Sequence, residues 1–165
     1  MSLIAAAPPL VRTTPPEDPA PLGRVSAGVW WPEIDLADLR DAMRLDGAIT
    51  PDRLLHATQE AVAATISQLA TWASTREQQG HASLEDVPAL KVDNESILVQ
   101  RFRRAVYCHA KANLLERYSD YDTTGRARRK DQEDTRDDQA EQHRRDATFA
   151  VRDILGVSRL TVELI

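Results

Sequence analysis

Residues 50–80 read TPDRLLHATQEAVAATISQLATWASTREQQG, and this stretch decides the fold class. Thr50 is a candidate N-cap, and Pro51 occupies the first helical position, where the missing N–H of proline does no harm. Gly80 is a candidate C-cap, so the stretch predicts one helix of about 28 residues, roughly 42 Å long. The apolar residues recur three and four positions apart, as on one helical face: Leu54, Leu55, Thr58, Val62, Ile66, Leu69 and Ala73.

The segments on either side carry the same periodicity. Asp35 is a candidate N-cap for a helix over 35–45, and Asp93 for a helix that follows a loop containing Pro88. A last apolar repeat runs from Ala147 to Gly156. The sequence therefore predicts an all-α protein, a small helical bundle. The residues expected to face the core from the third helix are Ile97, Leu98, Phe102, Ala105, Val106, Ala112, Leu115 and Tyr118.

The composition agrees with a helical protein. Of 165 residues, 42% are hydrophobic and 28% charged, which is enough to bury a core in one domain with tails. Aromatic residues make up 5% and there are six glycines, which argues against a β-sandwich or barrel. The net charge of −5 does not suit a protein that binds phosphates over its whole surface. No apolar run approaches the ~20 residues that span a bilayer, so we expect a soluble intracellular protein.

The two ends of the chain differ from the middle. Six of the nine prolines fall in the first 21 residues, so residues 1–29 are predicted to form an extended arm that is neither a helix nor a central strand. Residues 30–156 form the helical bundle domain, and residues 157–165 form a C-terminal tail. The strand-like end of this tail predicts strand addition to another polypeptide, or an apolar tail packed on the bundle. Its residues are Leu160, Thr161, Val162, Glu163, Leu164 and Ile165.

Two further segments stand out. Trp30 and Trp31 lie where the arm meets the bundle and predict an anchor that pins the arm to the core, a contact to a neighbouring subunit, or both.

The segment 125–146 holds seven basic and seven acidic residues. We expect it not to pack on the core but to be a solvated helix, a disordered loop or a surface for another chain. Its basic residues could contact DNA phosphates or a partner: Arg126, Arg128, Arg129 and Lys130.

No pattern in the chain predicts catalysis, a metal site or a cofactor. None of the histidines forms a pair four residues apart on a helix, and no glycine-rich phosphate loop is present. Cys108 is the single cysteine and is expected to be a small buried filler. His109 is expected at the edge of the core, bonded to a neighbour. The residues alone predict a non-enzymatic protein whose ends contact other subunits.

A series of short blocks along the chain carries a resemblance to a known protein family. The resemblance covers Trp30 to Ile165, and Asn94 stands where the family pattern has glycine. The order and spacing of the blocks carry it: Trp31-Pro32-Glu33-Ile34-Asp35, Thr50-Pro51-x-Arg53-Leu54, Asp93-x-Glu95-Ser96, Arg104-Ala105-Val106, Leu115-Glu116-Arg117-Tyr118 and Arg159-x-Thr161-Val162-Glu163-Leu164-Ile165. In this order the blocks resemble the head completion proteins of temperate, contractile-tailed bacteriophages.

The resemblance implies a head–tail connector of the virion, assembled in the host cytoplasm. Such a protein docks as a homo-oligomeric ring, expected to be a dodecamer, on the portal protein after DNA packaging. It stabilises the filled head and provides the platform for the tail. The implied partners are the portal, a tail terminator or other head–tail joining protein, and genomic DNA passing through the channel without sequence specificity. The alternative is a helical DNA-binding or packaging accessory protein.

Overall fold

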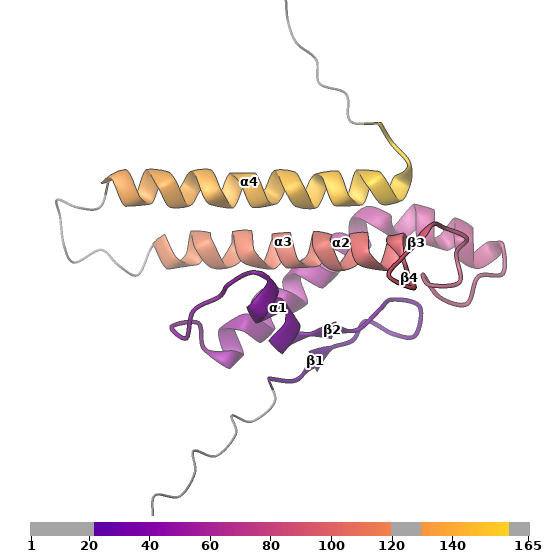
Figure 1. The fold of residues 1–165 in the computed structure, drawn as a ribbon, viewed down its shortest axis with the longest axis horizontal. Coiled ribbons are helices and arrows are strands. Elements are labelled where there is room, and N and C mark those ends of the chain that lie inside the picture. Colours follow the sequence, from indigo (N-terminus) through magenta and orange to yellow (C-terminus); the bar gives the residue numbers. More distant parts are fainter. Residues whose placement is uncertain (1–21, 120–129, 159–165) are drawn as a thin grey trace, which may run out of the picture.

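The computed structural model describes residues 22–119 and 130–158, and within these it is mostly helical (Figure 1). The prediction of a helical protein is confirmed, and two short antiparallel two-stranded sheets accompany the helices. The elements are β1 (Arg24–Val25), β2 (Ile34–Asp35), α1 (Leu36–Ala42), α2 (Pro51–Gln78), β3 (Lys91–Val92), β4 (Glu95–Ser96), α3 (Ile97–Ser119) and α4 (Lys130–Leu155).

The centre of the fold is α3. It lies antiparallel to α4 along the long axis of the molecule, while α2 crosses the pair obliquely (Figure 1). Small buried side chains allow α3 and α4 to approach closely, among them Ala105 and Ala112 on α3 and Ala140 and Ala147 on α4. In the described residues no helix is both long and apolar enough to cross a membrane.

The helix predicted over 50–80 is confirmed at both ends. The hydroxyl of Thr50 accepts a hydrogen bond from the Arg53 N–H at 3.4 Å, and Pro51 begins the 28-residue helix α2. After Gln78, Gly80 adopts the left-handed φ of +93° that glycine tolerates, and the N–H of His81 returns to the Arg76 carbonyl at 3.2 Å.

The start predicted for the third helix is wrong. Helix α3 begins at Ile97, because Asp93 and Asn94 form the turn between β3 and β4 with φ values of +53° and +61°. Two consecutive left-handed residues are the backbone of a tight type I′ hairpin. Ser96 accepts a hydrogen bond from the Leu98 N–H at 3.4 Å and so takes the place that we predicted for Asp93.

Helix α1 is shorter than predicted. Asp35 is the N-cap, but the helix ends at Ala42, and Arg44 turns the chain with a φ of +48°. Leu45 is buried although it lies after the end of the helix. The apolar repeat in the sequence therefore extends further than α1 itself.

The charged segment also differs in part from the prediction. Its residues from Lys130 onward belong to α4, and Ala140 on this segment is buried, so the expectation that the segment does not pack on the core is wrong there. Two ion pairs join it to α3: Arg144 with Glu116, and Arg104 with Asp146, whose charged atoms are 3.8 Å apart.

The described part of the predicted arm, residues 22–29, contacts the helical body. Strand β1 pairs with β2, Val25 is buried, and the Leu36 N–H donates to the Gly23 carbonyl at 3.1 Å. The predicted strand over 160–165 lies outside the described residues. Of the core residues expected on α3, five are buried and two, Ile97 and Leu115, are half-buried; the five are Leu98, Phe102, Ala105, Val106 and Ala112.

Candidate assembly surfaces

The two tryptophans at the start of the bundle join an aromatic cluster with Trp72 and Phe102. The ring of Trp31 stacks on Phe102 with centroids 5.0 Å apart, and Trp30 meets Trp31 and Trp72 edge-on at 4.5 and 6.2 Å. Aromatic pairs of this kind contribute about 0.5–1.5 kcal/mol each beyond their buried area. The cluster therefore connects the loop before β2 to both α2 and α3.

Polar contacts complete this connection. The Trp30 indole N–H donates to the His81 carbonyl at 3.3 Å, and the Leu84 N–H donates to the Trp30 carbonyl at 2.9 Å. The Arg76 guanidinium lies 5.3 Å from the centroid of the Trp72 ring. These contacts describe an internal anchor. A contact of Trp30 and Trp31 to a neighbouring subunit, the other role considered for them, stays a prediction.

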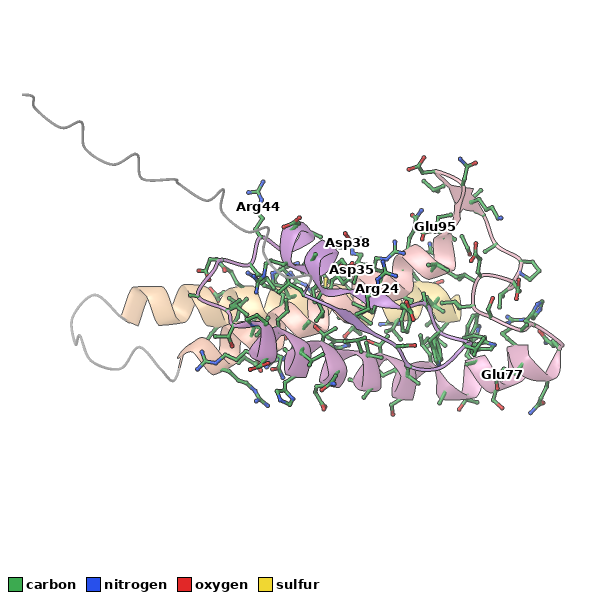
Figure 2. The ribbon with its side chains drawn as sticks, turned by 90° about the horizontal axis from the view of Figure 1, so that it is seen from below. Arg24, Asp35, Asp38, Arg44, Glu77 and Glu95 are labelled. Atoms are coloured by element: carbon green, nitrogen blue, oxygen red, sulfur yellow. The ribbon has the colours of Figure 1, made fainter. Side chains whose placement is uncertain are left out.

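The β3–β4 hairpin projects beside the start of α3, where Figure 2 labels Glu95. The Arg103 guanidinium donates to both carboxylate oxygens of Glu95 at 2.8 and 3.0 Å, which raises the pKa of Arg103. The Gln100 amide donates to the Val92 carbonyl at 2.7 Å. Side chains of α3 thus hold a hairpin that is too short to be stable alone.

One end of the molecule gathers exposed apolar side chains, and we call it the hairpin end. It comprises the β1–β2 loop, the β3–β4 hairpin and the C-terminal end of α4, which Figure 1 shows at the same end. Four large apolar residues are exposed in the described parts of the chain, and all four lie here: Val29, Leu90, Val92 and Val157. An end of the molecule at which large apolar side chains are exposed is a candidate interaction surface.

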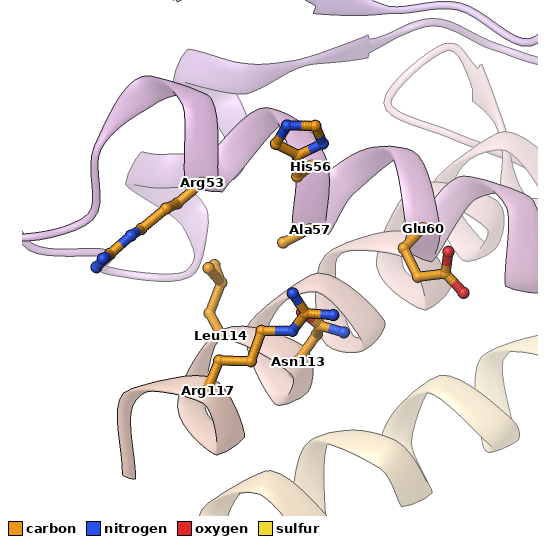
Figure 3. A pocket seen from close by; sticks show the side chains of 7 residues that line it. All are labelled: Arg53, His56, Ala57, Glu60, Asn113, Leu114 and Arg117. Atoms are coloured by element: carbon orange, nitrogen blue, oxygen red, sulfur yellow. The ribbon is translucent and has the colours of Figure 1, made fainter. Parts of the chain in front are cut away.

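A groove opens between α2 and α3 toward the other end of the molecule (Figure 3). It has a volume of about 610 Å³, and buried Ala57 and Leu114 form its apolar floor. We call it the α2–α3 groove. Its polar lining comes from two helices: Arg53, His56 and Glu60 on α2, and Asn113 and Arg117 on α3.

Burial favours the neutral form of several titratable side chains along α3 and α4. It raises the pKa of the Cys108 thiol and raises the pKa of Tyr107 to about 12. It lowers the pKa of His109, which is bonded to the Gln68 amide at 3.3 Å as a core-edge histidine would be. Burial and the charge of Lys111 lower the pKa of His143. Within the described ranges, no three His, Cys, Asp or Glu side chains are grouped so that they could hold a metal ion.

Most of the site residues predicted from the sequence are not placed by the structure. The tail residues Leu160–Ile165 and the basic residues Arg126, Arg128 and Arg129 lie outside the described residues, and Lys130 is the first residue of α4. Their roles stay predictions. The hairpin end and the α2–α3 groove were not predicted. The Leu90–Val92 run before Asp93-Asn94 was the available signal for the hairpin, whereas the groove joins residues about 60 positions apart.

The comparisons with known proteins identify the class of protein. Residues 25–165 match the family model described as phage head completion protein (GPL), and the chain belongs to this family. The family is one of structural phage proteins and not of enzymes, and membership implies a component of the virion.

One relative carries a more particular description. The head completion/stabilization protein of Escherichia phage P2 is 35% identical to this chain over 136 residues, which is 82% of this chain and 79% of the relative. No solved structure matches the chain. The resemblance drawn from the sequence blocks is therefore confirmed at the level of the family.

Proposed function

We propose that this chain is a head–tail connector subunit. It docks as a closed ring on the portal after DNA packaging, stabilises the filled head and provides the platform for tail attachment. This places it at the head–tail junction of the virion, in contact with the portal and with a tail terminator or other joining protein. The observation that carries the proposal is the family match, which extends over 25–165 and so includes the strand-like tail.

The physical argument for portal contact concerns this tail. Leu160, Val162 and Leu164 alternate with Thr161, Glu163 and Ile165, a pattern suited to a strand. An extended segment that adds to the edge of another sheet gains affinity from main-chain hydrogen bonds and specificity from alternate side chains. We propose that the tail makes this contact with the portal.

Shortened and substituted tails test the assignment. Deleting Leu160–Ile165 is expected to abolish binding to the portal protein, measured by co-sedimentation, while circular dichroism and urea unfolding of the bundle stay unchanged. Val162→Pro is expected to weaken binding strongly because proline removes a ladder N–H. The control is Val162→Thr, which keeps a β-branched side chain and the N–H and should bind. Portal binding that survives both changes would refute the tail assignment.

A DNA-binding or packaging accessory role is the second candidate, motivated by the basic run Arg126 to Lys130. Titration of double-stranded DNA against salt separates the two. A connector through which DNA slides should bind weakly and lose binding steeply as salt rises. Tight binding that persists at physiological salt and falls when Arg128 and Arg129 are changed to alanine would favour the second candidate.

A further inference from the structure

The hairpin end combines apolar and acidic groups. Val29 is 94% exposed and Leu90 is 73% exposed, so both side chains are available to a partner. A cleft of about 300 Å³ beside Val29 is lined by the carboxylates of Glu33, Glu85 and Glu95 and by a single guanidinium, that of Arg103. Because Arg103 pairs with Glu95, the cleft keeps an excess of negative charge.

The carboxylates of the hairpin end differ in how they are engaged. Glu33 has one weak partner, since its carboxylate lies 3.8 Å from the exposed Arg24 guanidinium. Glu85 is exposed and pairs with none of the described residues. Glu85 is therefore the carboxylate best able to accept a cation from outside the molecule.

The α2–α3 groove has the complementary character. It carries the guanidiniums of Arg53 and Arg117 and the imidazole of His56 against one carboxylate, that of Glu60. The Arg117 guanidinium is exposed and pairs with no described residue. The apolar floor and the cationic rim suit an apolar tip that is flanked by carboxylates.

These two surfaces cannot meet within one molecule. Arg53 lies in the first turn of α2, whereas the loop carrying Glu85 follows the other end of that helix. The 26 residues from Arg53 to Gln78 are separated end to end by about 38 Å of rigid helix. Two different complementary patches at separated places on one subunit are the requirement for a head-to-tail contact, which closes into a ring when the rotation permits.

We propose that the hairpin end of one copy docks into the α2–α3 groove of the next copy. Val29 and Leu90 cover the floor made by Ala57 and Leu114, and Glu85 pairs with Arg117. The proposal rests on the proposed ring and identifies the two surfaces that build it. Charge complementarity sets the register of the contact, and the exposed apolar residues supply buried area.

Charge reversal and charge exchange test this contact. The full-length chain is imaged by electron microscopy, alone and with the portal protein, and association of the free chain is followed by sedimentation velocity. Arg117→Glu and Glu85→Arg are each expected to weaken association at least about tenfold, since each places like charges together. The double variant is expected to regain rings.

Val29→Asp, at an exposed position, should also lose association while the fold persists in circular dichroism. The control is Asp138→Arg, an exposed acidic residue of α4 outside both surfaces.

The outcomes separate this inference from the proposed function. Wild-type rings that are lost in both single variants and restored in the double variant support the contact. Wild-type rings that persist in the single variants, or that the double variant does not restore, overturn the contact and leave the connector proposal standing. If the wild-type chain forms no ring either alone or on the portal, the ring proposal fails and the contact fails with it.

Discussion

At the scale of single residues, Asp35 joins two elements. One carboxylate oxygen accepts hydrogen bonds from the N–H groups of Ala37 and Asp38 at 2.8 and 3.3 Å, and the other accepts from the Arg24 guanidinium at 3.1 Å. The backbone bonds to Ala37 and Asp38, with help from Arg24, hold the pKa of Asp35 below its ordinary value. Since the pKa is lower in the folded protein, the ionised form stabilises the fold above the unfolded pKa, and the effect is lost as pH falls through the folded pKa.

Asp35→Asn tests this linkage. Asparagine is an equally good N-cap, so the variant removes the charge and keeps the cap. We expect the wild type to unfold at higher urea than the variant at pH 7, with a difference that is constant down to about pH 5 and shrinks toward pH 3. Urea midpoints at a series of pH values measure it. Asp41→Asn, on the exposed side of α1, is the control. A wild-type advantage that stays the same at pH 3 would contradict the assignment.

Local capping chemistry was predictable because it depends on a few adjacent atoms. Asp35, Thr50 and Pro51 were each assigned correctly, whereas Gly80, predicted as the C-cap, is the left-handed residue that follows the C-cap Gln79. Asp93 was assigned wrongly, because aspartate is common both at N-caps and in turns. Which of the two it adopts depends on whether strands flank it on both sides. Because β3 pairs with β4, Asp93 lies in the turn between them. The Gln100 side chain of α3 stabilises this hairpin by donating a hydrogen bond to the Val92 carbonyl.

At the scale of elements, the β3–β4 hairpin depends on the conformation of Asn94. With a φ of +61°, this residue occupies the left-handed region, which costs a β-branched residue about 1–2 kcal/mol. Glycine, which the family resemblance implies at this position, would adopt the same conformation without that cost. We expect Asn94→Gly to be neutral or slightly stabilising and Asn94→Val to lower the free energy of unfolding by about 1–2 kcal/mol.

Urea unfolding of both Asn94 variants checks this expectation. The control is Lys91→Val, which places the same side chain on an exposed strand position of the same hairpin and should be tolerated. Equal losses of stability in Asn94→Val and Lys91→Val would show that the turn conformation is not the cause.

The helices were predictable to the extent that their buried faces are large and apolar. That holds for α2, whose bounds were assigned correctly. It fails for the part of α4 that precedes Ala147, because the described residues there contribute a buried alanine and ion pairs such as Arg144 with Glu116, and neither produces an apolar repeat. Charge pairing across helices depends on their relative position, which the sequence of one helix does not contain.

At the scale of the whole molecule, the family was predictable and the assembly surfaces were not. Ordered blocks along the chain carry the family resemblance, so it can be read without a structure. The hairpin end and the α2–α3 groove each combine side chains from separate elements, such as Val29 with Leu90, and Arg53 with Arg117. Their charge and exposure become visible only when α2, α3 and the hairpin are placed together.

The place where the N-terminal arm ends is also a property of the whole molecule. The sequence assigns residues 1–29 to the arm, but Val25 is buried in the core and β1 pairs with β2. We expect removal of residues 1–21 to leave the free energy of unfolding within about 0.5 kcal/mol of the full chain. Removal of residues 1–29 should cost about 1.5–3 kcal/mol for the lost burial of Val25 alone, and more with the Leu36 to Gly23 hydrogen bond.

Urea unfolding of the two shortened chains beside the full chain decides between these boundaries. The shorter deletion is the matched control for the longer one, since both remove the proline-rich residues and only the longer one removes β1. Val25→Ala in the full chain should reproduce part of the loss, because it empties the same place in the core. If both deletions leave stability unchanged, the contacts of β1 contribute nothing measurable and the bundle begins at Trp30. If both destabilise equally, residues 1–21 themselves stabilise the fold.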